Sequence, residues 1–235
     1  MKKKLNILGV IPARGGSKGI KKKNITKILG KPLIYYTIKA AKKSKIISDL
    51  IVSTDSKEIA KISKKIGADV PFIRPKSLAT DKTQTLPVIK HALKKIELKK
   101  KKIFDYIVLI QPTCPLRTSK DIDLSVLKLI KSKFHSITSI TDVGATHPYR
   151  MKIIKNKRLK NFINQGYENM KPRQELKKVF IRNGAIYAFK RSVLLKEKSL
   201  VSKKNLPYIM PKERSINIDS HEDLLLAKFY LKKSY

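Results

Sequence analysis

Several residue types that characterise particular protein classes are scarce or absent in this sequence. Its 235 residues include no tryptophan, one cysteine and four histidines. Because the single cysteine, Cys114, cannot form an internal disulfide, the composition is typical of a reducing compartment, and we expect a cytoplasmic protein. The four histidines lie in unrelated segments, so their spacing does not indicate a zinc site.

Long apolar runs are also missing. No stretch approaches the roughly 18 apolar residues that indicate a membrane-spanning helix, so we expect no membrane partner. The N-terminal lysines precede an apolar run, as they do in a signal peptide. That run is short, contains Asn6, and reaches Arg14 without a small-residue cleavage site. We therefore interpret residues 5–11 as the first strand of the fold.

Acidic residues are few. The chain has 17 Asp and Glu against 55 Lys and Arg, which gives a formal net charge of +38. Such a charge is typical of nucleic-acid-binding proteins, and a basic protein of that class is one hypothesis. The lysines, however, are spread singly or in pairs over nearly every expected helix and turn, with one dense run at residues 99–102. Aromatic residues for base stacking are also few. We therefore expect weak, salt-sensitive binding of polyanions and no specific nucleic acid partner.

Apolar patterns of the strand type and of the helix type alternate along most of the chain. We expect strands at residues 5–11, 50–53, 70–73, 106–110, 136–141, 179–181, 185–189 and 216–218. We expect helices at residues 33–41, 59–66, 86–96, 118–130 and 224–231. Strands separated by helices predict an α/β fold, with a mostly parallel sheet covered by helices on both faces.

The length and the hydrophobic fraction of 41% fit a single domain that spans residues 1–235. Between residues 142 and 178 the alternation of strands and helices fails. We interpret this stretch as a small subdomain inserted into the main fold.

The richest motif is LGVIPARGGSKGIKKKN at residues 8–24, directly after the first expected strand. Its glycines permit unusual backbone angles, and successive amide groups in such a turn can face one anion. Arg14 and Lys18 add positive charge, and in parallel sheets ligands bind at the carboxyl ends of strands. The motif therefore predicts a polyphosphate-binding loop. It differs from the two common glycine-rich nucleotide motifs, so a basic surface turn is the alternative.

The whole string resembles the opening signature of the acylneuraminate cytidylyltransferases, the CMP-sialate synthetases, and among them the enzymes for neuraminic and legionaminic acids. Further matching motifs are RPxxLAxD at 74–81, LIQPTxPLR at 109–117 and NGAIY at 183–187. The resemblance implies a Rossmann-like fold of the nucleotide-diphospho-sugar transferase type, and a homodimer formed through the insert at 142–178. It also implies the reaction of CTP with N-acylneuraminate or N,N'-diacetyllegionaminate to give a CMP-sugar and diphosphate. Pseudaminate or an octulosonate is the alternative substrate.

The resemblance also implies roles for individual residues. Catalysis would depend on Arg14, Lys18 and Asp219. CTP would contact Arg14, Gly15, Ser17, Lys18, Asn24, Arg74 and Asp81. The nine-carbon sugar acid would contact Gln111, Thr113, Arg150, Arg173, Gln174 and Asn183. Each has a structural alternative, because the arginines would equally suit a solvated surface and Gln111 would suit a strand end. Cys114 stands where the family often has serine, and we expect a small inert side chain there.

A divalent cation is the expected cofactor. Nucleotidyl transfer concentrates negative charge on phosphate, which Mg²⁺ neutralises through oxygen ligands. The family usually has IDID where residues 216–219 here read INID. We therefore expect Asp219 and Asn217 to face the metal from one side of a strand. Either one protein carboxylate serves each metal in place of two, or Asp223 or a loop residue contributes. The structural alternative is that Asp219 only stabilises the start of the last helix.

Overall fold

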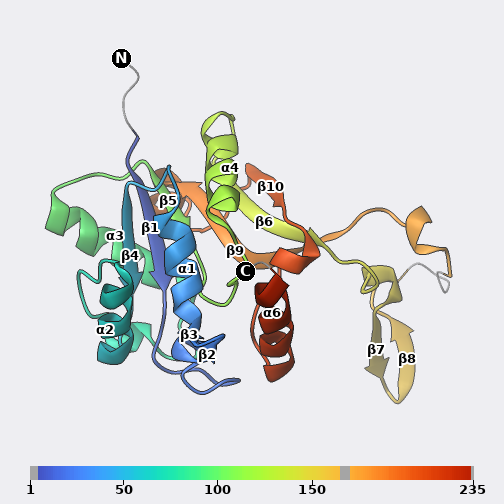
Figure 1. Ribbon diagram of the computed structural model, residues 1–235. Coiled ribbons are helices and arrows are strands. Elements are labelled where there is room, and N and C mark those ends of the chain that lie inside the picture. The colour runs from blue at the N-terminus through green and yellow to red at the C-terminus, as the bar shows by residue number, and fades with distance from the viewer. Residues whose placement is uncertain (1–4, 165–169, 234–235) are drawn as a thin grey trace.

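The computed structural model describes residues 5–164 and 170–233, and its centre is one six-stranded sheet with the strand order β10-β6-β9-β5-β1-β4 (Figure 1). The strands are β1 (Ile7–Pro12), β4 (Asp49–Ser53), β5 (Tyr106–Leu109), β6 (Ser136–Asp142), β9 (Phe180–Lys190) and β10 (Asn205–Ile209). β1 runs parallel to β4 and β5, and β10 runs parallel to β6, whereas β9 is antiparallel to both of its neighbours. The expected α/β class with a mostly parallel sheet is confirmed.

Helices cover both faces of this sheet. One layer contains α1 (Leu33–Lys42), α2 (Lys57–Ile66) and α4 (Ser119–Ile130), and the other contains α3 (Thr85–Lys100) and α5 (Arg191–Leu195). Alternate side chains of β1 serve the two layers, because Ile7 and Ile11 belong to one apolar cluster and Leu8 and Val10 to the other. A strand buried on both faces reads as a continuous apolar run, as the sequence of β1 does.

Local signals set the helix limits. α2 begins after Ser56, whose hydroxyl accepts the Ile59 amide, and it ends at Gly67, which has a φ of 94°. α4 begins with a capping box, in which Thr118 and Asp121 each accept the other's backbone amide. These caps place the preceding loops firmly at the carboxyl edge of the sheet.

The C-terminal helix α6 (His221–Lys233) packs outside the sheet, against a third apolar cluster. This cluster includes Ile20 from the glycine-rich loop, Leu33 from α1, and Ile218. A short ribbon of β2 (Lys27–Ile28) and β3 (Lys31–Pro32) and the short helix η1 (Lys23–Ile25) lie between the loop and α1. Through Ile20 and Ile218, the apolar cluster packs the glycine-rich loop against the segment just before α6.

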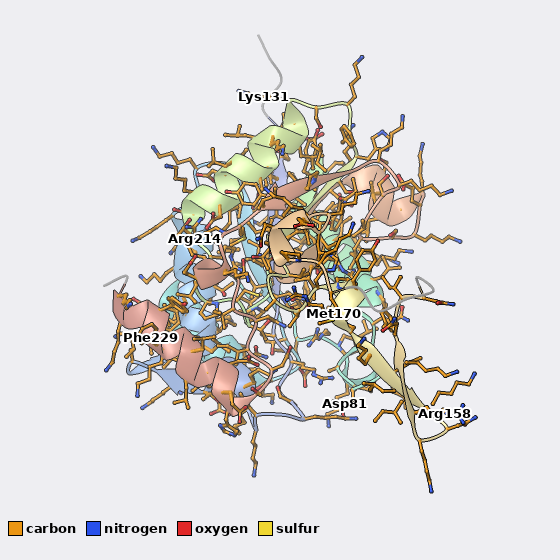
Figure 2. The ribbon with its side chains drawn as sticks, turned by 90° about the vertical axis from the view of Figure 1, so that its right-hand side faces the viewer. Asp81, Lys131, Arg158, Met170, Arg214 and Phe229 are labelled. Atoms are coloured by element: carbon orange, nitrogen blue, oxygen red, sulfur yellow. The ribbon has the colours of Figure 1, made fainter. Side chains whose placement is uncertain are left out.

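The stretch between β6 and β9 leaves the body of the molecule. It contains the hairpin of β7 (Lys152–Lys155) and β8 (Arg158–Asn161), together with the short helices η3 (Pro148–Arg150) and η4 (Arg173–Glu175). The hairpin projects to one side (Figure 1), and Figure 2 shows Arg158 near its outer end. Two of its apolar side chains, Ile154 and Leu159, are 80% and 70% exposed, so a single chain leaves them in water.

Three expectations about strands are wrong. Residues 70–73 form no strand and contribute only an isolated bridge between Thr54 and Ile73. Residues 216–218 pair with no strand, although the Ile218 amide donates to the Thr113 carbonyl at 2.8 Å. Strands 179–181 and 185–189 are one strand, β9, whose register against β6 shifts between Thr138 and Ile140.

The sequence analysis did not predict the strand β10, which includes Pro207. Proline is tolerated there because β10 is an edge strand of the sheet. The other short elements are η2 (Lys76–Leu78) and η5 (Lys212–Arg214). Within the described residues, no helix combines the length and the apolar character that crossing a membrane would need.

Candidate functional site

A cavity of about 630 Å³ lies at the carboxyl ends of β1 and β5. It brings together most of the residues that the sequence indicated from separate motifs: Arg14, Ser17, Lys18, Asn24, Arg74, Asp81, Gln111, Thr113, Asn217 and Asp219. Gly15 belongs to the same loop. This position is where parallel α/β sheets bind ligands, since loops from several strands meet there.

Asp55, at the end of β4, organises the glycine-rich loop. Its Oδ1 accepts the Gly15 amide at 3.0 Å and lies 3.5 Å from Nη2 of Arg74. On the other side of the loop, the Asn24 amide group donates to the Arg14 carbonyl at 2.9 Å. Asn24 is buried and fixes the loop backbone through this bond. The sequence analysis gave Asp55 no role.

Gly19 is required by a close approach of two backbones. A Cβ at this position would lie 2.5 Å from the carbonyl oxygen of Asp219. Gly16, in the same loop, would meet nothing within 4 Å. The missing side chain of Gly19 therefore lets the loop contact the segment that carries Asp219.

Arg14 and Lys18 both face the carboxylate of Asp81. Arg14 Nη2 lies 2.8 Å from Asp81 Oδ1, and Lys18 Nζ lies 3.7 Å from Oδ2. Arg14 also donates to the Thr80 carbonyl at 2.8 Å. A carboxylate repels phosphate, so Asp81 meets the predicted phosphate-binding cations as their counterion. The expected contact of Asp81 with CTP stays a prediction, and in this structure its carboxylate faces the two cations of the loop.

Arg74 is not a surface residue, because only 4% of it is exposed. Burial lowers the pKa of its guanidinium, and the neighbouring Asp55 opposes that shift. Its Nε has no hydrogen-bond partner among the described atoms, although the side chain lines the cavity. Buried polar groups usually have partners, so Arg74 is suited to receive an anionic or polar ligand.

Gln111 forms part of the cavity wall beside a bulge in β9. Gly184 in that bulge has a φ of 75°, and a Cβ there would lie 2.6 Å from Gln111 Oε1. Arg117, which is fully buried, donates to the carbonyls of Gln111 and Ala185 at 3.2 and 2.9 Å. Burial lowers its pKa to about 10. These contacts hold the end of β5 against the bulge.

Asn183 does not face the cavity as a free donor. Its Oδ1 accepts from Ser139 at 2.6 Å and from the Ala185 amide at 3.1 Å, and its Nδ2 donates to Ser215 at 2.9 Å. Its polar atoms are engaged and the residue is 4% exposed, so the structure does not place it in the cavity lining, and its contact with substrate stays a prediction. Asn183 instead supports the bulge.

Cys114 lies beneath the cavity and is fully buried. Its thiol donates to the Asn183 carbonyl at 3.1 Å. Burial raises its pKa to about 11, so the thiol is neutral at physiological pH. A neutral thiol is a poor nucleophile, which agrees with the expected inert side chain.

Asp219 is held by two neighbours. Lys23 Nζ lies 2.8 Å from its Oδ1 and donates to the Ile218 carbonyl at 2.8 Å, while Asn217 Nδ2 donates to Oδ2 at 2.7 Å. Asp219 does not cap α6, because Asp223 accepts the amides of residues 219 and 220 at 2.9 Å. The side chain of Asp219 thus contacts Lys23 and Asn217, whereas one oxygen of Asp223, Oδ2, accepts the backbone amides at the start of α6. The role of Asp219 as a metal ligand stays a prediction.

Lys23 is the residue that sequence reasoning missed. It lies in a run of three lysines that looks like a solvated turn, yet its side chain is only 12% exposed. No signal in the sequence separates it from the other two lysines of the run, and its enclosure follows from the fold. Lys22, its neighbour, has a side chain that is 59% exposed.

The oxygen atoms at Asp219 fit a magnesium ion that takes few of its ligands from the protein. Among the described residues, no group of three or more His, Cys, Asp or Glu side chains gathers at one point. The Asp219 side chain is 70% exposed and lines the cavity. Mg²⁺ often uses one or two carboxylates, with substrate phosphates and water completing its shell, so one carboxylate is compatible with such a site.

Among the described residues that line the cavity, none comes from the insert of the same chain. Arg150 donates to the Lys171 carbonyl at 3.4 Å, and Gln174 lies exposed in η4. The side chain of Arg173 lies outside the described part of the structure. His147, at the base of the insert, is buried, accepts the Tyr149 amide, and contacts the Lys177 carbonyl at 3.0 Å.

Residues 8–232 match the cytidylyltransferase family. The chain is 36% identical over 235 residues to the post-translational flagellin modification protein B of Campylobacter coli, covering 97% of this chain and 95% of that protein. It is 37% identical over 225 residues to the CMP-N,N'-diacetyllegionaminic acid synthase of Campylobacter jejuni, covering 96% and 94%. It is 34% identical to the N-acylneuraminate cytidylyltransferase of Escherichia coli, of which it spans about half, 51%.

Solved structures share the fold at low sequence identity. A CMP:2-keto-3-deoxy-manno-octonic acid synthetase, complexed with CTP, superposes with a TM-score of 0.71 at 16% identity, covering 98% of this chain and 100% of that one. The 4-diphosphocytidyl-2C-methyl-D-erythritol synthase of Anaerococcus prevotii gives 0.67 at 16% identity, with the same coverage. The match to the family model and the identity to full-length relatives establish that the chain belongs to the cytidylyltransferase family.

Proposed function

We propose that the protein transfers CMP from CTP to a nonulosonic acid of the sialic or legionaminic type and releases diphosphate. The observation that carries this proposal is one cavity that joins Arg14 and Lys18, on the glycine-rich loop, with Asp219 and Gln111. The relatives named for legionaminic and neuraminic acids, at 37% and 34% identity, support the substrate class.

The phosphates of CTP would bind between Arg14 and Lys18 and displace the carboxylate of Asp81. Arg74, buried in the cavity wall, would contact the nucleotide, and Gln111 would offer a donor and an acceptor to the sugar acid. The C2 hydroxyl oxygen of the sugar acid would form a bond to the α-phosphorus as the bond to diphosphate breaks. The protein contributes orientation and charge stabilisation, which are the main terms in transfer at phosphorus.

The hydroxyl proton would leave to solvent water. The carboxylates among the described cavity-lining residues are Asp81 and Asp219, and both are ion-paired. No histidine is among those residues. When bound, Mg²⁺ would be held by Asp219 and would neutralise phosphate charge. Lys23, beside Asp219, adds a further positive charge near the transferring phosphate.

The insert would complete the site from a second copy of the chain. Its hairpin exposes the apolar side chains of Ile154 and Leu159, and such surfaces mark interaction sites. In a homodimer, Arg150, Arg173 and Gln174 of one copy would reach the sugar acid bound by the other. A guanidinium binds a carboxylate through two donors, which suits the acid group of the substrate.

Two alternatives remain to be tested, namely a different sugar acid as substrate and a nucleic-acid-binding role. Pseudaminic acid cytidylyltransferase of Campylobacter jejuni is 29% identical over 228 residues, so pseudaminate is the main alternative sugar, with an octulosonate behind it. A nucleic-acid-binding role has less support, because nitrogen-tipped side chains project on all sides of the body in Figure 2 and do not gather on one face. Specific binding that survives physiological salt in a filter assay would favour that role.

The test is diphosphate release by the purified protein with CTP and a panel of acids: N-acetylneuraminate, N,N'-diacetyllegionaminate, pseudaminate and an octulosonate. We expect turnover with CTP and one of the first two, dependence on Mg²⁺, and loss of turnover in Arg14→Ala. Lys22→Ala, which removes a positive charge that is exposed and outside the cavity lining, is the matched control. Turnover with pseudaminate alone would reassign the substrate, and none with any acid would contradict the proposal.

A further inference from the structure

Asn217 stands where the resembling family usually has a second carboxylate, and its amide group lies between two unlike neighbours. Its Nδ2 is 2.7 Å from Asp219 Oδ2, and its Oδ1 is 3.5 Å from Cys114 Sγ. The two ends of the amide therefore face a carboxylate on one side and a buried thiol on the other.

The chemistry of Asp219 determines which way this amide points. An ionised carboxylate only accepts hydrogen bonds, so the NH₂ group of Asn217 must face it, and a rotated amide would place oxygen against oxygen. The Asn217 oxygen then points to Cys114, whose thiol already donates to the Asn183 carbonyl at 3.1 Å. The oxygen that could bind a cation is thus directed away from Asp219.

Lys23 engages the remaining oxygen of Asp219 at 2.8 Å, with a side chain that is 12% exposed. The group of Lys23, Asn217 and Asp219 then has no net charge. A free divalent cation would meet a single carboxylate whose charge Lys23 already offsets, which is a weak site because affinity depends on the number of charged ligands. The phosphates of CTP would supply ligands for the cation and a new anionic partner for Lys23.

We infer that Asn217 is a positioning residue that orients Asp219 by donating to it and does not ligate the metal, so that the divalent cation enters the site together with the nucleotide. The inference rests on the proposed function, because it assumes that CTP binds this cavity. With asparagine at position 217 in place of aspartate, the metal site would have one protein carboxylate, that of Asp219.

The test uses Mn²⁺ as the probe, in the full-length protein with and without CTP. Binding is followed by electron paramagnetic resonance, and the water molecules on the bound Mn²⁺ are counted from line broadening in ¹⁷O-water. The variants are Asn217→Ala, Asn217→Asp and Asp219→Ala, each checked for native folding by circular dichroism and thermal unfolding.

We expect wild-type protein to bind Mn²⁺ at least ~10-fold more tightly with CTP than without it, and Asn217→Asp to remove most of that difference. With CTP, Asn217→Ala keeps the wild-type number of bound waters, whereas Asp219→Ala gains one and Asn217→Asp loses one. Turnover by Asn217→Ala falls by ~10-fold, because an orienting partner is lost, while KM for CTP changes little.

A gained water in Asn217→Ala, as in Asp219→Ala, would make Asn217 a ligand and overturn the inference. Tight Mn²⁺ binding by the wild type without CTP would also overturn it. Both results leave the proposed function intact. Failure of the wild type to bind CTP, measured by calorimetry, would instead overturn the proposed function and this inference with it.

Discussion

Replacing Asp81 by asparagine should tighten the binding of CTP. Arg14 and Lys18 meet the Asp81 carboxylate at 2.8 and 3.7 Å, and a triphosphate that binds the same two cations must compete with it. Asparagine keeps the size and polarity of the side chain but removes its charge. The variant therefore separates competition from any direct contact between Asp81 and the nucleotide.

The expected effect is modest, because the three side chains are partly in water. Coulomb's law in water gives about 1.5 kcal/mol for a pair at 2.8 Å and about 1.1 kcal/mol at 3.7 Å. The side chains of Arg14, Lys18 and Asp81 are 32%, 78% and 45% exposed, and ion pairs of this kind contribute about 0.2–1 kcal/mol. We therefore expect a gain of about 1 kcal/mol, which is about fivefold in Kd.

The assay is isothermal titration of CTP into wild type and Asp81→Asn at low and at physiological salt. Glu197→Gln is the matched control, since it also removes one partly exposed carboxylate, one that faces His135 away from the cavity. We expect no change in Kd for the control and a smaller gain for Asp81→Asn as salt rises. Weaker CTP binding by Asp81→Asn, or the same gain in both variants, would refute the competition.

Three further predictions concern other contacts of the site. Lys23→Met should lower kcat about 100-fold, because a charge beside the transferring phosphate is lost, whereas Lys22→Met, with an exposed side chain, should change it about twofold at most. Gly19→Ala should lower the free energy of unfolding by about 1–3 kcal/mol and reduce turnover, because the added methyl group would overlap the Asp219 carbonyl. Gly16→Ala, whose methyl group would contact no atom within 4 Å, should change neither stability nor turnover. Equal thermal unfolding of the two variants would contradict this. Because burial raises the pKa of the Cys114 thiol to about 11, iodoacetamide at pH 8 should leave the folded protein unmodified and alkylate it only in guanidinium; rapid modification of the folded protein would contradict the burial.

The sequence was sufficient for the features that depend on local chemistry. The glycine-rich loop follows a strand buried on both faces, and the positions of Arg14 and Lys18 in the cavity follow from that topology. Gln111 and Asp219 reach the same cavity because loops at the carboxyl edge of the sheet converge.

Features that depend on long-range contacts could not be predicted. The local sequence of residues 216–218 reads as a strand, but its one backbone bond to Thr113 leaves it unpaired in the sheet. Asn183 looks like a free donor until the neighbouring strand and Ser215 engage its side chain. Lys23 is indistinguishable from its neighbours in composition, and only the fold shows that its side chain is enclosed beside Asp219.

The charge pattern shows the same limit. Counting residues reveals a strongly basic chain, but it does not show that Asp81 faces Arg14 and Lys18. The family motif groups Asp81 with the nucleotide-binding residues, whereas its geometry makes it the counterion of two of them. Sequence patterns indicate which residues gather at a site, and the distances between them decide what each one does there.

The central claim is that this cavity binds the triphosphate of CTP on the glycine-rich loop, with Asp219 opposite. A crystal structure of the protein with CTP and Mg²⁺ tests it most directly. We predict phosphate oxygens within hydrogen-bond distance of Arg14 and Lys18, Asp81 displaced from both, and the cation on Asp219. Nucleotide bound elsewhere on the chain, or phosphates that leave the pair of Arg14 and Asp81 intact, would contradict the account.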